Sequence, residues 1–155
     1  MDLSDLLKPD GVLPDLHVQS KKQALQEICE AAARLTGLAG REIFDTILQR
    51  ERLGSTGVGH GIAIPHGKLK AMPELVGIFA RLARPVDFDA LDDQPVDLVF
   101  LLLAPESAGA DHLKALARIA RVLRDGAVAQ KLRAAGDAAG LYRILIDPAQ
   151  SSHAA

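Results

Sequence analysis

Two of the five histidines, His66 and His112, stand where an imidazole could do chemistry. His66 follows the short apolar run 62–64 (IAI), which is typical of a buried strand, and it lies between Pro65 and Gly67. Proline ends a strand because it has no N–H for the ladder, and glycine leaves the backbone bare beside the ring. Neutral imidazole, with a reference pKa of about 6.5, is nucleophilic at neutral pH without an activating base. His66 is therefore a candidate nucleophile toward a phosphoryl group, while its spacing alone also fits an inert histidine in a turn.

His112 and Arg50 are placed to assist such a reaction. His112 lies in the first turn of the helix predicted over residues 110–124, where the helix N-terminus keeps an imidazole neutral and offers N–H groups to an anion. Arg50 lies at the end of the helix predicted over about 40–52, and its guanidinium fork suits phosphate oxygens. The alternatives are a half-buried histidine at a helix start and a solvated arginine that complements the helix C-terminus.

The glycine-rich segment at 54–68, GSTGVGHGIAIPHGK, does not match a nucleotide-binding loop. Gly61 and Gly67 enclose five residues where a P-loop has four, and Leu69 stands where a P-loop has serine or threonine. No G-x-G-x-x-G motif occurs either. The two histidines of this segment are six positions apart, about 20 Å in an extended chain, which is too far for two ligands of one metal ion. We therefore expect no cofactor and no metal.

The composition excludes several functional classes. The 155 residues carry a formal net charge of −2, so no bulk basic field exists to hold nucleic acid or an anionic membrane. A single cysteine rules out an intramolecular disulfide and a CxxC metal site. The chain begins without a signal-peptide pattern, and no apolar run approaches the roughly 18 residues of a membrane span. We expect a cytoplasmic protein without membrane insertion.

The hydrophobic periodicity predicts strands interleaved with helices. Ser20 is the expected N-cap of a first helix, and Gly37 is its expected stop. The near-continuous apolar run 96–104 is typical of a strand at the centre of a sheet. This alternation indicates a single-domain α/β sandwich with a frayed, flexible tail at 148–155. The other expected strands cover 16–18, 62–64 and 76–82, and the other expected helices cover 40–52, 110–124, 126–135 and 137–146.

Residues 54–68, preceded by Arg50-Glu51, resemble the signature of the phosphotransferase-system enzyme IIA domains of the fructose/mannitol class. More narrowly, the chain is similar to the nitrogen-type enzyme IIA proteins. This likeness implies one enzyme IIA domain over 3–147, with a mixed parallel and antiparallel sheet of about five strands flanked by helices on both faces. The segments that carry it, besides the signature, are QSKKQAL at 19–25, FDALDDQPVDLVFLLLAP at 88–105 and DHLKALARIARVL at 111–123.

The resemblance also implies a role for each candidate site residue. His66 matches the histidine that is phosphorylated, and His112 matches a second histidine that orients the reacting group. Arg50, sixteen residues before His66, matches an arginine that steadies phosphoryl oxygens. The residues that match the loop around the phosphoryl group are Ser55, Thr56 and Gly67.

The implied function is that of a regulatory phosphocarrier. It would accept a phosphoryl group from the phosphohistidine of an HPr-like protein, and regulatory targets such as sensor kinases or potassium transport components would distinguish its two states. An apolar rim of Leu53, Val58 and Leu113 would receive the partner. Two alternatives stay open: a sugar-specific enzyme IIA that passes phosphate to a IIB component, and a non-catalytic binding module. His60 stands where nitrogen-type members usually have asparagine, so it either tunes the charge of the site or caps the loop.

Overall fold

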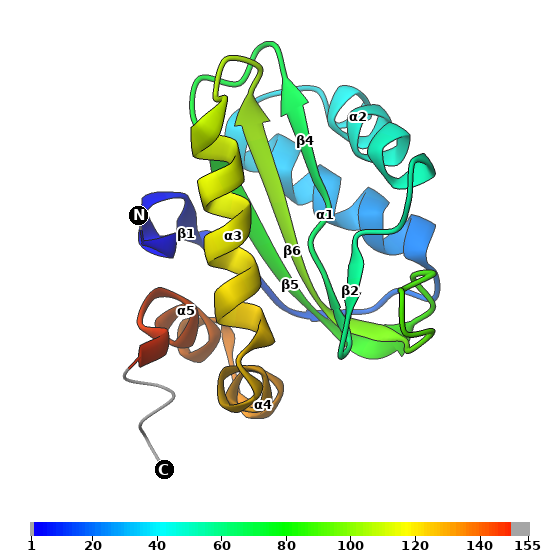
Figure 1. Cartoon of the computed structure of the whole chain (residues 1–155), viewed down its shortest axis with the longest axis vertical. Coiled ribbons are helices and arrows are strands. Elements are labelled where there is room, and N and C mark those ends of the chain that lie inside the picture. The colour runs from blue at the N-terminus through cyan, green and yellow to red at the C-terminus, as the bar shows by residue number, and fades with distance from the viewer. Residues whose placement is uncertain (1, 150–155) are drawn as a thin grey trace.

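Strand β6 (Val96–Pro105) lies at the centre of the sheet in this computed structural model, which describes residues 2–149. All of its residues except Asp97 and Pro105 are buried, because helices cover both faces of the sheet (Figure 1). A strand covered on both faces needs apolar side chains in both directions, which explains its near-continuous apolar run. The predicted central strand is therefore confirmed.

Within residues 2–149 the sheet is mixed and has six strands. Its strands are β1 (Leu7–Leu16), β2 (Gly57–Gly59), β3 (Ile62–Ala63), β4 (His66–Leu69), β5 (Val76–Val86) and β6. They lie in the order β1-β5-β6-β3-β2, with β4 also paired to β6. β6 runs antiparallel to β5 and parallel to β3 and β4, while β1 runs parallel to β5. The expected mixed sheet of about five strands is confirmed.

Strand β1 differs from the prediction of a short strand at residues 16–18, because it lies earlier and is longer. Pro9, Gly11 and Pro14 interrupt its apolar alternation, so the sequence carries no clear strand pattern there. In the described part of the chain β1 pairs with β5 alone, at an edge of the sheet, where one side of the strand needs no N–H donors and proline is tolerated. Its register against β5 is also irregular.

The spacing predicts His66 just past the end of a strand, but in the structure His66 opens another strand, β4. Pro65 interrupts the pairing along β6 only briefly. Ala63 pairs with Val99, and His66 pairs with Leu102. The carbonyl of Pro65 still accepts a hydrogen bond from the Leu102 amide at 2.9 Å. β3 and β4 are therefore consecutive segments that pair with the same edge of β6. The chain bends between them at Pro65, which has no N–H group to donate to the ladder.

Helices form a separate layer on each face of the sheet (Figure 1). One layer packs its apolar side chains against a first core cluster, and the other layer packs against a second. The predicted helix boundaries are confirmed to within one residue at each end. The first layer holds α1 (Lys21–Thr36) and α2 (Gly40–Arg52), the second holds α3 (Ala110–Arg124), α4 (Gly126–Ala134) and α5 (Ala138–Ile146), and a 3-10 turn, η1 (Leu3–Asp5), precedes β1.

The ends of α1 show why its boundaries can be read from the sequence. The Ser20 hydroxyl oxygen accepts a hydrogen bond from the Gln23 amide at 3.1 Å, as an N-cap does. Gly37 ends the helix with a φ of 78°, a left-handed conformation that glycine adopts without steric cost. Its amide donates to the carbonyl of Ala33 at 2.9 Å, which satisfies one of the last carbonyl groups of the helix.

The described part of the chain ends shortly after α5. That helix closes at Ile146, and residues 150–155 lie outside the described part. The predicted flexible tail at 148–155 therefore falls mainly outside it. Across residues 2–149, no helix is both long enough and apolar enough to span a bilayer.

Helix α2 lies close to β4 because Gly67 has no side chain. A Cβ atom at this position would lie 2.9 Å from Cγ2 of Thr46 and 3.3 Å from Cδ1 of Ile47. Ile47 is completely buried, so it has little room to give way. This close approach sets the middle of α2 against β4, and Arg50, one turn further along α2, lines the same pocket as His66.

We expect the Gly67→Ala variant to lower the free energy of unfolding by about 1–3 kcal/mol, because the added methyl group forces α2 away from β4. Gly126→Ala is the matched control: no atom lies within 4 Å of its added Cβ, and alanine favours the helix that begins there. Urea denaturation of both variants measures the difference. A Gly67→Ala protein as stable as the wild type would contradict the close approach.

Candidate active site

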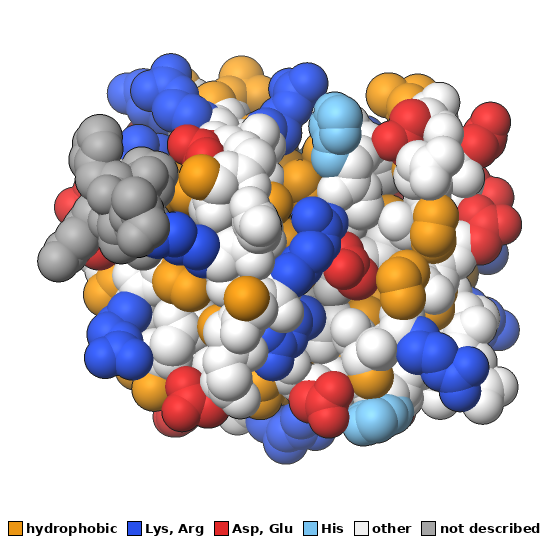
Figure 2. Space-filling model, turned by 90° about the horizontal axis from the view of Figure 1, so that it is seen from below, with side chains coloured by type: hydrophobic (Ala, Val, Ile, Leu, Met, Phe, Trp, Pro, Cys, Tyr) orange, Lys and Arg blue, Asp and Glu red, His pale blue; other side chains and the backbone are white. Residues whose placement is uncertain are grey.

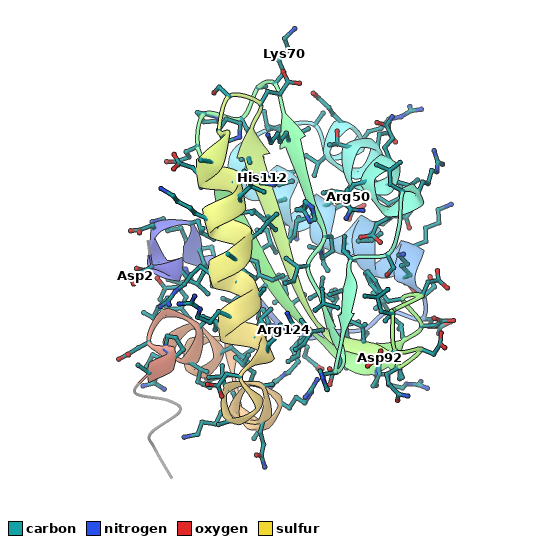
Figure 3. All side chains as sticks on the ribbon, viewed as in Figure 1. Asp2, Arg50, Lys70, Asp92, His112 and Arg124 are labelled. Carbon is teal, nitrogen blue, oxygen red and sulfur yellow. The ribbon has the colours of Figure 1, made fainter. Side chains whose placement is uncertain are left out.

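An open pocket of about 370 Å³ lies where α2, β4 and α3 come together. Figure 3 shows Arg50 at the end of α2 and His112 near the start of α3 on opposite sides of β4. The pocket thus brings together predicted site residues that lie far apart in the sequence. Its lining residues are Thr46, Gln49, Arg50, Leu53, His66, Gly67, Lys68 and His112.

One hydrogen bond fixes the orientation of the half-buried ring of His66. Its Nδ1 lies 2.9 Å from the carbonyl oxygen of Ile64. A carbonyl oxygen can only accept, so Nδ1 carries the proton and donates it. The other ring nitrogen, Nε2, therefore keeps its lone pair, because a neutral imidazole carries one proton. The ring is held with its nucleophilic nitrogen directed away from its own backbone partner.

The surroundings of His66 keep its ring neutral at pH 7. Burial is the largest influence and lowers the pKa of His66 from its ordinary value of 6.5. The hydrogen bond with Ile64 raises this pKa, the guanidinium of Arg50 lowers it, and the carboxylate of Glu51 raises it. The net direction is downward, so the unprotonated and nucleophilic form predominates at neutral pH.

His112 lies beside His66, with a distance of 5.6 Å between ring centroids and an angle of 51° between ring planes. The residue is 9% exposed, and its Nε2 is buried without a hydrogen-bond partner among residues 2–149. Burial is the main cause that lowers the pKa of His112, followed by the neighbouring charges of His66 and Lys68. A buried polar atom without a partner is costly. A group bound next to His66 that bonded this nitrogen would remove that cost.

Positive charge lines the pocket. Nη1 of Arg50 donates to the carbonyl of Gly54 at 2.9 Å, which uses only part of the guanidinium fork. Lys68 lies two residues beyond His66 along β4, so both side chains leave the same face of the strand. Aspartate and glutamate are absent from the lining residues of this pocket. The arrangement favours a bound anion.

The structure does not bring Ser55 and Thr56 into this pocket, although the resemblance implies that they bind the phosphoryl group. The Ser55 hydroxyl donates to the carbonyl of Phe88 at 2.6 Å and accepts from the amide of Gly57 at 3.0 Å. Thr56 is 3% exposed, and its hydroxyl donates to the carboxylate of Glu51. Both hydroxyls therefore fix the conformation of the loop, through hydrogen bonds to residues outside the pocket.

Three further lining residues, Thr46, Gln49 and Lys68, are missing from the sequence prediction. Residues 46, 49, 50 and 53 have the i, i+3, i+4, i+7 spacing of one helix face, along α2 and its C-cap. Extending that face from the predicted arginine would have found Thr46 and Gln49. The alternation of side chains along a strand would have found Lys68 from the predicted histidine.

His60 lies outside the pocket, in the exposed turn between β2 and β3. Its φ is 58°, its amide donates to Oδ2 of Asp92 at 2.9 Å, and its carbonyl accepts from Nη2 of Arg133 at 2.8 Å. Figure 3 shows Asp92 at the end of the molecule opposite to Lys70, and Figure 2 shows that end, where basic and acidic side chains are interspersed. Of the two roles considered for His60, these contacts favour capping of the loop. Residues 2–149 contain no group of three or more histidine, cysteine or acidic residues that could hold a metal ion.

Comparison with known proteins gives consistent results. The chain is 61% identical to a nitrogen regulatory protein of Bradyrhizobium diazoefficiens, over 96% of this chain and 97% of that protein. The crystal structure of the nitrogen regulatory protein IIA-Ntr from Neisseria meningitidis superimposes with a TM-score of 0.88 at 35% identity, covering 92% of this chain and 98% of that one. A fructose-specific EIIA component of Haloferax volcanii is 39% identical, over 73% of this chain and 74% of that protein.

The sequence pattern of one protein family covers nearly the whole chain. That family is described as the phosphoenolpyruvate-dependent sugar phosphotransferase system, EIIA 2, and it matches residues 5–147. The match includes every residue of the pocket. The chain therefore belongs to the EIIA type 2 family of the phosphoenolpyruvate-dependent sugar phosphotransferase system, and its relatives include proteins named nitrogen regulatory proteins.

Proposed function

We propose that this protein is a phosphocarrier with a mainly regulatory role, in which His66 accepts a phosphoryl group from the phosphohistidine of an HPr-like protein. The observation that carries the proposal is the state of His66, a neutral ring whose Nδ1 is held by Ile64 while Nε2 keeps its lone pair. Membership in the EIIA type 2 family supports the same chemistry.

The transfer exchanges one N–P bond for another. The lone pair on Nε2 of His66 attacks the phosphorus of the donor, in line with the donor's N–P bond. As the new bond forms, the old one breaks and its electron pair stays on the donor ring. No proton has to leave Nε2, because the proton already sits on Nδ1. The positive charge that develops on the ring is stabilised by the hydrogen bond from Nδ1 to the carbonyl of Ile64.

The pocket supplies positive charge for the phosphoryl group that His66 accepts. A bound phosphoryl group carries about −1.5 to −2 charges at neutral pH. Arg50 and Lys68 line the pocket and offset this charge, and the hydrogen bond to Gly54 already holds the Arg50 guanidinium in place. Nε2 of His112 is buried and has no hydrogen-bond partner in the part of the chain that the structure describes, and it bonds a phosphoryl oxygen when it carries the ring proton.

The rim of the pocket offers an apolar contact to the donor. Leu53 lines the pocket and is 86% exposed, and Leu113, next to His112, is 66% exposed. Exposed leucines beside a charged pocket suit a partner that must dock and leave. Val58, the third predicted rim residue, is only partly exposed and packs against the core cluster beneath α3.

The regulatory part of the proposal follows from the change in charge. Phosphorylation adds about −1.5 to −2 charges to a neutral ring in an open pocket, so a target that accepts one form disfavours the other. The 61% identity to a protein named for nitrogen regulation supports this role. Sensor kinases and potassium transport components are the targets that the nitrogen-type resemblance suggests.

Two other functions compete with this one. A sugar-specific enzyme IIA would pass its phosphate to a IIB component. The fructose-specific relative at 39% identity supports this alternative. The higher identity and wider coverage of the nitrogen regulatory relative favour the regulatory role. A non-catalytic binding module would have the same fold and would accept no phosphoryl group.

Incubation with phosphoenolpyruvate, enzyme I and an HPr-like carrier should add a single phosphoryl group, seen by intact-mass spectrometry. The adduct should be labile in acid and stable in base, as a phosphohistidine is, and absent from His66→Ala. Addition of a IIB component should leave it in place. An unmodified wild-type protein would favour the binding module, and discharge by IIB would favour sugar transport.

Replacement of Arg50 should slow acceptance, because the pocket loses a preorganised donor to the phosphoryl oxygens. We expect the initial rate of Arg50→Ala to fall by about 10²- to 10³-fold, with Arg50→Lys in between. Arg52→Ala is the matched control, since Arg52 is an exposed arginine in the same helical turn and does not line the pocket. Equal rates for Arg50→Ala and Arg52→Ala would exclude the proposed contact.

The regulatory role can be tested with two charge variants of the acceptor. His66→Asp carries a permanent negative charge in the pocket, whereas His66→Ala keeps it uncharged. We expect a purified target, such as a sensor kinase, to bind these two proteins with affinities that differ by about tenfold or more, measured by calorimetry. Identical affinities for every target tested would refute the switch.

A further inference from the structure

A buried carboxylate lies directly behind the turn that carries Arg50. The side chain of Glu51 is 3% exposed, and its Oε2 lies 2.8 Å from Nζ of Lys21. The amide of Thr56 donates to the same carboxylate at 3.2 Å, and the Thr56 hydroxyl donates to its other oxygen. We refer to Lys21, Glu51 and Thr56 as the Glu51 cluster.

The Glu51 cluster is not explained by stability alone. Removing a carboxylate from water costs several kcal/mol, and a buried ion pair often does no more than offset that cost. Here the carboxylate is satisfied by an ammonium group, an amide and a hydroxyl, so its position is closely defined. A closely defined buried charge next to a functional pocket suggests that its role is to fix geometry.

The first link from the Glu51 cluster to the pocket runs through the turn after α2. Arg50 and Glu51 are consecutive, so their side chains leave the helix about 100° apart. Arg50 lines the pocket, while Glu51 enters the cluster. The Arg50 guanidinium donates to the carbonyl of Gly54, and the Gly54 amide donates to the carbonyl of Glu51 at 3.1 Å. Leu53 lies in the same turn, so the anchoring of Glu51 sets where Arg50 and Leu53 stand.

The second link runs through Thr56 to the acceptor ring itself. The carbonyl of Thr56 accepts a hydrogen bond from the amide of Ile64 at 3.0 Å. The carbonyl of Ile64 in turn accepts from Nδ1 of His66 at 2.9 Å. An unbroken chain of hydrogen bonds and covalent links therefore joins Glu51, through Thr56 and Ile64, to His66.

Lys21 ties the Glu51 cluster to a third part of the chain. Its Nζ donates to the carbonyl of Phe88 at 3.3 Å and lies 4.9 Å from the centre of the Phe88 ring. The hydroxyl of Ser55 donates to the same carbonyl. The loop around Thr56 is thereby held between α1 and the segment that follows β5.

We propose that Glu51, supported by Lys21 and Thr56, is a positioning residue for phosphoryl acceptance at His66. It sets the turn that presents Arg50 and Leu53, and it supports Ile64, which orients the acceptor ring. The proposal rests on the proposed function. The negative charge of Glu51 also acts on the His66 ring, because its carboxylate raises the pKa of His66 and so favours the positively charged ring. A positive charge develops on this ring when Nε2 bonds phosphorus.

The test compares Glu51→Gln with Glu42→Gln, an exposed glutamate on the same helix. We expect the initial rate of phosphoryl acceptance at saturating donor to fall by about 10- to 100-fold in Glu51→Gln and to be unchanged in Glu42→Gln. Titration of His66 by NMR should show a lower pKa in Glu51→Gln, since a charge that raises it is gone. Lys21→Arg, which keeps the ion pair, should retain most of the wild-type rate.

The outcomes separate this inference from the proposed function. A wild-type protein that accepts no phosphoryl group refutes the proposed function, and the positioning role falls with it. If the wild type accepts phosphate and a folded Glu51→Gln accepts it at the same rate, only the positioning role of Glu51 is refuted. If Glu51→Gln does not fold, Thr56→Val, which removes only the hydroxyl from the cluster, takes its place. A wild-type rate in that variant refutes the inference, and a reduced rate with normal folding supports it.

Discussion

The hydrogen bond between Nδ1 of His66 and the carbonyl of Ile64 is the interaction on which the rest of the account depends. It assigns the single proton of a neutral imidazole to one nitrogen and leaves the other free to react. Without it the ring could exchange its proton between two positions and turn about its side-chain bonds. Its donor and acceptor are only two residues apart, so the chain must depart from a regular ladder at that point.

Pro65 and the strands on either side of it produce this break in the regular ladder of strand pairing. β3 and β4 both pair with β6, and the proline between them lets the chain bend without leaving the sheet. The carbonyl of Pro65 is used by the ladder, whereas the carbonyl of Ile64 is used by the histidine ring. The buried central strand makes this bend rigid, because β6 is packed on both faces. A small local irregularity is thus held by the buried central strand of the sheet.

The two helix layers contribute different chemistry to the same pocket. The layer with α2 supplies Arg50 and, behind it, the buried carboxylate of Glu51. The layer with α3 supplies His112, whose neutral ring lies against the acceptor ring. Opposite charges from consecutive residues act on His66 in opposite senses, since Arg50 lowers its pKa and Glu51 raises it. The ring therefore stays neutral at rest, while a negative charge is close enough to favour the cation formed during transfer.

The helices and the candidate site residues can be predicted from the sequence. The position of β1 and the convergence of the site residues cannot. The helices are found because their caps, such as Ser20 and Gly37, and their apolar spacing are local signals. Strand β1 is misplaced to residues 16–18, because its stability comes from pairing at a sheet edge and its prolines hide the pattern. His66, His112 and Arg50 can be named in advance, but their convergence depends on how α2 and α3 pack across β4.

The hydroxyls of Ser55 and Thr56 illustrate the same limit. A polar pair in a glycine-rich loop suggests a direct contact with phosphate, and nothing in the local sequence reveals which way the side chains turn. The direction of the Thr56 hydroxyl is decided by buried Glu51, and that of the Ser55 hydroxyl by the carbonyl of Phe88, which is more than thirty residues away from Ser55. Contacts between distant segments of this kind require the folded structure.

The central claim is tested most directly by determining the tautomer of His66 with ¹⁵N NMR in the unphosphorylated protein at pH 7. The account predicts that the ring is neutral, with the proton on Nδ1 and the lone pair on Nε2. A proton on Nε2, or a ring that carries both protons at this pH, would contradict it.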